Sequence, residues 1–312
     1  MKVVFHYDAG PALRRQLESY NAVGLDIVSC SESDNEPFET EIRTADALWH
    51  VLKPVTASVI TNAPRLKLIQ KIGVGVNTID LDAARAAGVA VCNMPGSNSR
   101  AVAEMTLLLM LSSVRLQPRV DRVCRTGGWV LDEQTRESFT EIAGKTVGLV
   151  GFGATAQLLA PILKAMGANV IFSARQKKSS GYPQYSLEEL VTRADIISLH
   201  IPLTPETTRL FDEEMIRSMK PGAIFINTAR GGLVDESALQ RALEDGHIRS
   251  AGLDVFEQEP VRPDNPLLKM DNVTVAPHAA WLTNETLERS VDIAVANTLA
   301  IANAGALAYR VA

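Results

Sequence analysis

The stretch from Gly144 to Arg175 constrains the fold of this chain more than any other. An apolar run, Val147–Val150, predicts a short buried strand, and the glycines on either side of Phe152 predict a tight turn after it. Apolar residues at helical spacing follow over 154–166, and 170–172 suits a second strand. A strand, a glycine turn, a helix and a strand within about thirty residues form the dinucleotide-binding βαβ unit.

The small residues of this turn each have a physical reason. Gly151 permits the turn, and Gly153 lets backbone N–H groups approach a pyrophosphate. Ala156 allows close packing of helix on strand, and the anion would lie at the helix N-terminus, where unpaired N–H groups favour negative charge. A purely structural turn is the alternative, but the strand–helix context favours a cofactor. The expected cofactor contacts are Gly151, Phe152, Gly153, Thr155 and Ala156.

Composition limits the class of protein. With 312 residues the chain can form two domains, and 46% hydrophobic with 21% charged residues is typical of a soluble globular protein. The net charge of -5 provides no basic field, so we expect no nucleic-acid partner. Cys30, Cys92 and Cys124 are far apart, which predicts thiols in a reducing compartment and neither disulfides nor a metal site.

No segment predicts export or membrane insertion. His6 and Asp8 come too early for the apolar core of a signal peptide. The longest apolar run, near Met105–Leu111, is roughly half the twenty residues that a membrane span needs, and it predicts a buried helix. We therefore expect a cytoplasmic protein.

Residues 1–95 predict a first α/β domain. Strands are expected near 3–5, 25–28, 47–52, 66–72 and 89–91, and helices over 11–20 and 82–87. Strands that alternate with helices predict a parallel sheet covered on both faces.

The second domain is expected over 96–282. Ser99 suits the N-cap of a long apolar helix from Arg100 to about Arg115, and 125–141 predicts a polar connection. Ser186 and Glu189 have capping-box spacing. Further strands are expected over 195–201, 222–228, 251–255 and 273–275, and helices over 213–219 and 236–243.

No strand follows the helix expected over 283–303, so it must pack on one of the two domains. We expect residues 283–312 to complete the first domain, with hinges near Pro95 and Pro277. The second domain would then be an insertion into the first.

Three polar residues follow predicted strands, where open α/β sheets bind their ligands. Arg230 suits binding of a 2-oxo acid carboxylate and carbonyl through its planar fork. His278 suits protonation of the carbonyl oxygen, and Glu259 can hold the imidazole in its protonated form. Singly, each could be an ordinary surface, loop or turn residue. Their common position at strand ends favours a catalytic set.

At these residues the chain resembles a known family. NTARGGLVDESAL, GLDVFEQEP and APHAAW, together with GFGATAQ, are similar to the signature segments of the D-isomer-specific 2-hydroxyacid dehydrogenases. KIGVGVNTIDLDAARAAGV and SNSRAVAEMTLLLML also match, so the resemblance covers nearly the whole chain. It implies an α/β fold of two Rossmann-like domains, a flavodoxin-like substrate domain and an inserted doubly wound nucleotide-binding domain, with a cleft between them.

The resemblance also implies site residues. Arg230 would bind substrate, and Glu259 would pair with the catalytic His278. Backbone N–H groups of Val74, Gly75 and Val76 would bind the substrate carboxylate, which suits an anion nest between glycines; a structural turn is the alternative. Asp254 would contact the nicotinamide carboxamide, or alternatively stabilise a turn. The remaining expected cofactor contacts are Ile201, Pro202, Thr228, Ala229 and Trp281.

The residues at the end of the second strand of the βαβ unit predict whether NADH or NADPH is preferred. An NAD-binding unit has an acidic residue there, whereas this chain has Ser173, Ala174 and Arg175 and no carboxylate between Gly151 and Glu188. Serine and arginine suit a 2′-phosphate. We therefore predict a preference for NADPH, with NADH possible if Arg175 stacks on adenine.

The HAAW segment with Trp281 resembles the glyoxylate and hydroxypyruvate reductase subgroup, although Trp281 could instead be a packing residue. The predicted function is thus reduction of a small 2-oxo acid by a homodimer, whose contact would be the 100–115 helix. An NAD-dependent D-3-phosphoglycerate dehydrogenase is less expected, because many of those enzymes carry a C-terminal regulatory domain and this chain ends at Ala312. A formate dehydrogenase is less expected, because those enzymes pair the catalytic His with Gln and this chain has Glu259. A dinucleotide-sensing corepressor is the alternative of another class, because it could keep the same site residues.

Overall fold

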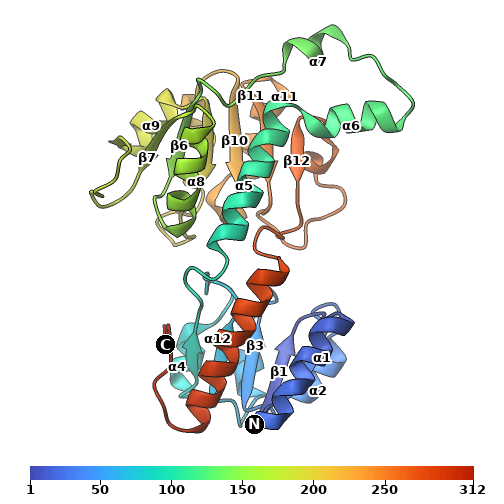
Figure 1. The fold of residues 1–312 in the computed structure, drawn as a ribbon, viewed down its shortest axis with the longest axis vertical. Helices are drawn as coiled ribbons and strands as arrows, with labels where there is room; N and C mark the ends of the chain where they lie inside the picture. Colours follow the sequence, from blue (N-terminus) through green and yellow to red (C-terminus); the bar gives the residue numbers. More distant parts are fainter. The chain divides into compact units, whose positions relative to one another are not determined.

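The structure, a computed structural model, describes residues 1–312, and the chain divides into two compact units (Figure 1). Unit 1 consists of Met1–Asn98 and Thr283–Ala312, and unit 2 is Ser99–Leu282. The chain therefore leaves unit 1 after Asn98, rather than after residue 95, and returns to it at Thr283.

Unit 1 is built on a five-stranded parallel sheet with the order β2-β1-β3-β4-β5, which is the flavodoxin-like arrangement. Its strands are β1 (Lys2–His6), β2 (Asp26–Cys30), β3 (Ala47–His50), β4 (Leu68–Lys71) and β5 (Ala90–Cys92). Its helices are α1 (Pro11–Ser19), α2 (Asn35–Ile42), α3 (Ala57–Thr61), α4 (Leu81–Ala86) and α12 (Asn284–Ala302).

The C-terminal helix α12 is part of unit 1 because its polar side chains bond to the central strands. Trp49 of β3 donates its indole N–H to Thr298 Oγ1 at 3.0 Å. Asn297 donates to Gln70 Oε1 of β4 at 2.6 Å. Apolar side chains of α2, α3 and α4 pack against β1, β3, β4 and β5 in one buried cluster.

Unit 2 contains a seven-stranded parallel sheet with the order β12-β11-β10-β9-β6-β7-β8. The strands are β6 (Thr146–Val150), β7 (Asn169–Ser173), β8 (Gln184–Tyr185), β9 (Ile196–Leu199), β10 (Ala223–Asn227), β11 (Ile248–Leu253) and β12 (Val273–Val275). The strand order reverses between β6 and β9, as in a doubly wound nucleotide-binding fold. Both sheets confirm the α/β class.

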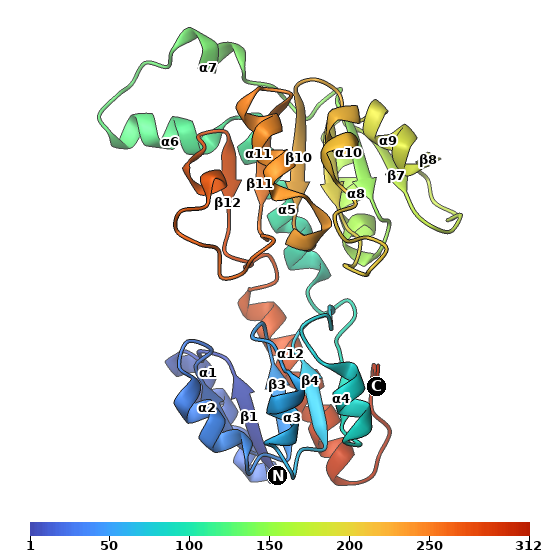
Figure 2. The same cartoon turned by 180° about the vertical axis from the view of Figure 1, so that it is seen from behind.

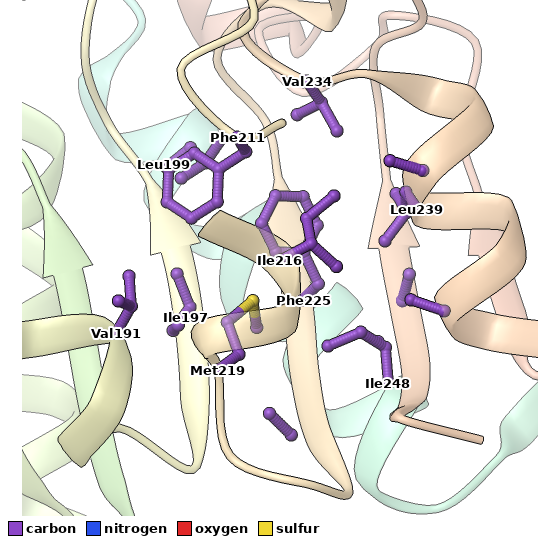
Figure 3. Packing of buried hydrophobic residues seen from close by; sticks show 14 of the residues in the cluster. Val191, Ile197, Leu199, Phe211, Ile216, Met219, Phe225, Val234, Leu239 and Ile248 are labelled. Carbon is purple, nitrogen blue, oxygen red and sulfur yellow. The ribbon is translucent and has the colours of Figure 1, made fainter. Parts of the chain in front are cut away.

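Helices cover both faces of this second sheet (Figures 1 and 2). On one face lie α5 (Ser99–Val114) and α8 (Ala154–Ala165), and on the other α9 (Leu187–Arg193), α10 (Glu213–Ser218) and α11 (Glu236–Glu244). Side chains of β10 alternate between the two cores: Phe225 packs with α10 and α11, whereas Ile224 and Ile226 pack on the α5 side. Figure 3 shows Phe225 among Phe211, Ile216 and Met219.

Several expected elements differ from those observed. The long apolar helix begins at Ser99 itself, so Ser99 is its first residue and not its N-cap. The connection expected over 125–141 contains α7 (Glu133–Glu137), and α6 (Gln117–Arg125) precedes it. α6 was not predicted, although Val120, Val123 and Cys124 have the i, i+3, i+4 spacing of one helix face; none of its side chains is fully buried.

The short helices α2 and α3 were also not predicted from the sequence. In α2, Asp34 accepts from Glu36 N, and the buried Phe38 and Ile42 lie one helical turn apart. α3 has only five residues, beginning after Thr56. The capping box of Ser186 and Glu189 is confirmed at the start of α9. None of the helices is both long enough and apolar enough to span a bilayer.

Candidate functional site

The turn after β6 has the geometry that a dinucleotide pyrophosphate requires. Gly151 has φ 95°, and a Cβ there would lie 2.4 Å from the His200 carbonyl oxygen, so only glycine fits. Gly153 is the N-cap of α8 without a side-chain cap, and no atom lies within 4 Å of the place where its Cβ would be. Open backbone at the start of a twelve-residue helix is suited to an anion.

The other residues of the turn divide between packing and exposure. The Phe152 side chain is buried and stacks on Phe172 at 4.1 Å between ring centroids, so only its backbone can face a cofactor. Ala156 is fully buried against the sheet, as its small size predicts, and Thr155 is half-buried.

The end of β7 presents the residues expected to select the cofactor. Ser173 accepts from Gly151 N through its carbonyl at 2.9 Å, which places the two strand ends side by side. Ser173 and Ala174 are half-buried, and Arg175 is exposed.

A carboxylate that is distant in sequence lies near Arg175. Glu206 belongs to the loop after β9, and the Thr204 hydroxyl donates to its carboxylate at 2.7 Å. This hydrogen bond, assisted by the charge of Arg175, lowers the pKa of Glu206. Sequence spacing could not indicate this residue, because only the strand order β9-β6-β7 brings the two loops to the same edge of the sheet.

The structure brings Glu259 and His278 together within unit 2. His278 Nδ1 lies 2.6 Å from Glu259 Oε2, and Phe256 N donates to Glu259 Oε1 at 3.0 Å. Burial acts to raise the pKa of Glu259, but the hydrogen bond and charge of His278, with the charge of Arg230, lower it overall. Glu259 is therefore held as the carboxylate that orients the imidazole.

Arg230 follows β10 and lies within electrostatic reach of the same carboxylate. Its Nη1 donates to the Ala229 carbonyl at 2.6 Å. Burial lowers the pKa of Arg230, while the charge of Glu259 opposes that shift. The structure thus groups Arg230, Glu259 and His278, each from the end of a different strand.

Asp254 and an unusual backbone conformation position His278. His278 has φ 53°, in the left-handed region, and its N–H donates to the Asp254 carbonyl at 2.7 Å. The buried Asp254 carboxylate accepts from Ala279 N at 2.8 Å and Ala280 N at 3.0 Å. The structure therefore gives Asp254 a turn-stabilising role, and its contact with a nicotinamide stays a prediction.

Two residues outside the predicted site shape the Arg230 loop. Asn227 accepts from Ala229 N at 3.0 Å and donates to the Arg230 carbonyl at 2.9 Å. A Cβ on Gly231 would lie 1.9 Å from the Phe256 carbonyl, so glycine alone lets this loop pass against the segment that carries Glu259. An Asn before a turn and a Gly after Arg230 were the available sequence signals.

The remaining expected contacts lie in both units. Thr228 is buried and its hydroxyl is 2.9 Å from that of Thr106; Trp281 is buried; Ala229 and Ile201 are half-buried; Pro202 is exposed. In unit 1, the N–H groups of Val74, Gly75 and Val76 donate to no other group of the protein, and Val74 is exposed. Such N–H groups are suited to an anion.

No cluster of His, Cys, Asp or Glu suited to a metal ion is present.

Comparison with known proteins gives consistent matches. The family model described as "D-isomer specific 2-hydroxyacid dehydrogenase, NAD binding domain" matches residues 107–280. A glyoxylate reductase of Aeropyrum pernix is 38% identical over 282 residues, covering 85% of this chain and 83% of the relative. The crystal structure of the TT0316 protein from Thermus thermophilus superimposes with a TM-score of 0.91 at 36% identity, covering 100% of both chains.

A D-3-phosphoglycerate dehydrogenase of Mycobacterium bovis is 42% identical over 276 residues. The match covers 86% of this chain but 52% of that relative. The chain thus spans about half the length of the phosphoglycerate dehydrogenases that it matches.

Proposed function

The chain belongs to the D-isomer specific 2-hydroxyacid dehydrogenase family, and on this premise we propose that it reduces small 2-oxo acids, with glyoxylate or hydroxypyruvate first and NADPH as the preferred cofactor. The observation that carries the proposal is the hydrogen-bonded pair of His278 and Glu259 beside Arg230. This set supplies an acid, its orienting carboxylate and a carboxylate-binding cation.

Each residue of the set has one task in the proposed reaction. The bound cofactor would supply the hydride to the substrate C2. Arg230 would bind the substrate carboxylate and polarise the carbonyl through its guanidinium fork. Because His278 Nδ1 bonds to Glu259, Nε2 is the atom that donates the proton to the carbonyl oxygen.

The proposed NADPH preference rests on Ser173 and Arg175 at the end of β7, because the strand end itself has no carboxylate to repel a 2′-phosphate. The glycine turn and the open start of α8 would hold the pyrophosphate. Glu206 acts in the opposite direction, because its negative charge lies near Arg175 and competes with a phosphate.

The second candidate is an NAD-dependent D-3-phosphoglycerate dehydrogenase, favoured by the 42% identity to that group. A single screen of steady-state rates separates the candidates. Glyoxylate and hydroxypyruvate are each assayed with NADPH and with NADH, and 3-phosphoglycerate is assayed with NADP⁺ and with NAD⁺. We expect the largest kcat/KM with NADPH and glyoxylate or hydroxypyruvate. A clear preference for NADH, or turnover of 3-phosphoglycerate alone, would exclude the leading proposal. A corepressor-like protein would bind dinucleotide and turn over none of these substrates.

The role of His278 has its own test. His278→Ala should lower kcat by about 10²- to 10⁴-fold, the usual contribution of a general acid, while NADPH binding measured by fluorescence stays unchanged. An unchanged kcat would remove His278 from the mechanism, whereas loss of NADPH binding would indicate a structural role instead.

A further inference from the structure

A small pocket opens in unit 2 at the edge of the sheet where its strands begin. Its volume is about 150 Å³. The wall is formed by the segment before β6, the starts of β9 and β10, and one residue of β11. The residues that line it are Thr140, Lys145, Asp195, Ile196, Lys220, Pro221, Gly222, Ala223, Ile224 and Arg249.

Positive charge exceeds negative charge in this pocket, although the whole chain has a net charge of -5. Lys145, Lys220 and Arg249 line the pocket together with a single carboxylate, that of Asp195. Asp195 is already bonded on both oxygens, since Oδ1 pairs with Lys220 Nζ at 2.9 Å and Oδ2 accepts from Thr146 N at 2.7 Å. The pocket therefore holds two cations more than its carboxylate neutralises.

The remaining cations retain donors that could face a ligand. The Lys145 ammonium has no hydrogen-bond or ion-pair partner in the protein. Arg249 donates one Nη1 bond, to the Ser138 carbonyl at 3.3 Å, and keeps the rest of its guanidinium fork.

The floor of the pocket is preorganised by backbone hydrogen bonds. Ile224 N donates to the Asp195 carbonyl and Ala223 N to the Lys220 carbonyl, each at 3.0 Å. Gly222 N donates to the His247 carbonyl at 2.8 Å. A rigid floor reduces the entropy that a ligand must overcome on binding.

We propose that this pocket binds a phosphate group, either inorganic phosphate or the monoester of a small metabolite. An arginine fork with two lysines is suited to a tetrahedral dianion. The volume is below the roughly 300–1,000 Å³ of sites for larger organic ligands, so the pocket is too small for a second dinucleotide.

The site is distinct from the one described above, and it rests on no part of the proposed function. β10 begins at Ala223 in the pocket and ends at Asn227 beside Arg230, which corresponds to about 13 Å of strand. A phosphate in the pocket therefore occupies the opposite edge of the sheet from the glycine turn.

The test is calorimetric titration of the full chain with inorganic phosphate and, separately, with glycerol phosphate, at constant ionic strength set by chloride. We expect binding that raises Tm, with Kd weakened at least tenfold in Lys145→Gln and in Arg249→Gln. The Lys145 side chain makes no hydrogen bond, so its replacement should leave the fold intact. Tighter binding of glycerol phosphate would identify a monoester as the ligand, and equal or weaker binding would identify inorganic phosphate.

Lys269→Gln is the matched control, because Lys269 is an exposed lysine of the same unit outside the pocket. Its Kd should equal that of the unmodified protein. Absence of phosphate binding, or equal Kd values in the pocket variants and the control, would overturn the proposal, since phosphate would then bind elsewhere or not at all.

Discussion

At His278 the left-handed backbone, with φ 53°, costs a non-glycine residue on the order of 1–2 kcal/mol. Asp254 offsets this cost, because its carbonyl accepts from His278 N and its carboxylate accepts from the next two N–H groups. The conformation that orients the imidazole is therefore maintained by a buried carboxylate that need not touch the substrate.

Asp254→Asn should destabilise the protein and lower kcat. The amide nitrogen of asparagine would face a backbone N–H, so one buried donor would lose its partner, at a cost of about 1–3 kcal/mol. Denaturant unfolding and kcat are the measurements. Asp212→Asn is the control, because Asp212 caps α10 and asparagine caps a helix equally well. A loss no greater than in this control would contradict the assigned role of Asp254.

Three histidines, His6, His50 and His200, make stability depend on pH, and burial with the charge of Lys71 lowers the pKa of His50. Burial, with the charge of Lys53, lowers the pKa of His6 to about 4, and burial alone lowers the pKa of His200 to about 4. In the unfolded chain a histidine has a pKa near 6.5. The folded state therefore binds fewer protons, and stability is complete above pH 6.5 and falls as the pH decreases toward 4.

The expected loss of unfolding free energy approaches 1.4 kcal/mol per pH unit for each histidine. Urea unfolding at pH 7, 6 and 5 measures it. His6→Phe keeps a ring stacked on Phe38 but does not titrate, so its pH dependence should be shallower. Parallel curves for the variant and the unmodified chain would show that His6 contributes nothing to acid sensitivity.

At the scale of elements, the site depends on how closely two loops pass each other. The loop after β10 carries Arg230 and the loop after β11 carries Glu259, and Gly231 lies against the Phe256 carbonyl. Gly231→Ala would place a methyl group 1.9 Å from backbone atoms that cannot rotate away.

We expect Gly231→Ala to lower the unfolding free energy by about 2–5 kcal/mol and to raise KM for the 2-oxo acid more than KM for the cofactor. Displacement of Arg230 would cause the rise in KM for the 2-oxo acid. Gly181→Ala serves as the control, because no atom lies within 4 Å of the position of its Cβ. Equal Tm values for the two variants would show that the loops move apart at little cost.

At the scale of the whole molecule, one segment of unit 2 exposes apolar side chains. Trp129 and Val130, which are 89% and 82% exposed, lie between α6 and α7 in an extension from the sheet and its helices (Figure 1). α5 also exposes Leu108. Adjacent exposed apolar side chains such as Trp129 and Val130 are typical of an interaction surface.

We propose that the expected homodimer forms through this segment and not through the 100–115 helix, because α5 packs largely inside unit 2. Light scattering after gel filtration should give twice the chain mass, and the double variant Trp129→Ser and Val130→Ser should shift it toward the monomer. Val23→Ser removes an exposed apolar residue of unit 1 and should not change the mass. A monomer before substitution, or an unchanged mass after it, would contradict a dimer formed by this segment.

The sequence alone determined the two α/β domains and the order of the motifs. Buried parallel strands are continuous apolar runs, and the glycine turn after Val150 has few structural alternatives. Very short helices such as α3 and α7, of five residues each, were not predictable, because fewer than two helical turns cannot show an apolar periodicity.

Only the tertiary structure decided which side chains meet. Strand order brings Glu206 near Arg175, loop crossing at Gly231 brings Arg230 near Glu259, and the edge pocket assembles residues from four separate segments. The motifs predicted the set of Arg230, Glu259 and His278, but they did not indicate Glu206 beside Arg175 or the edge pocket, since sheet order joins residues far apart in the chain. Local patterns therefore determine the elements, while packing between elements determines the electrostatics of the sites.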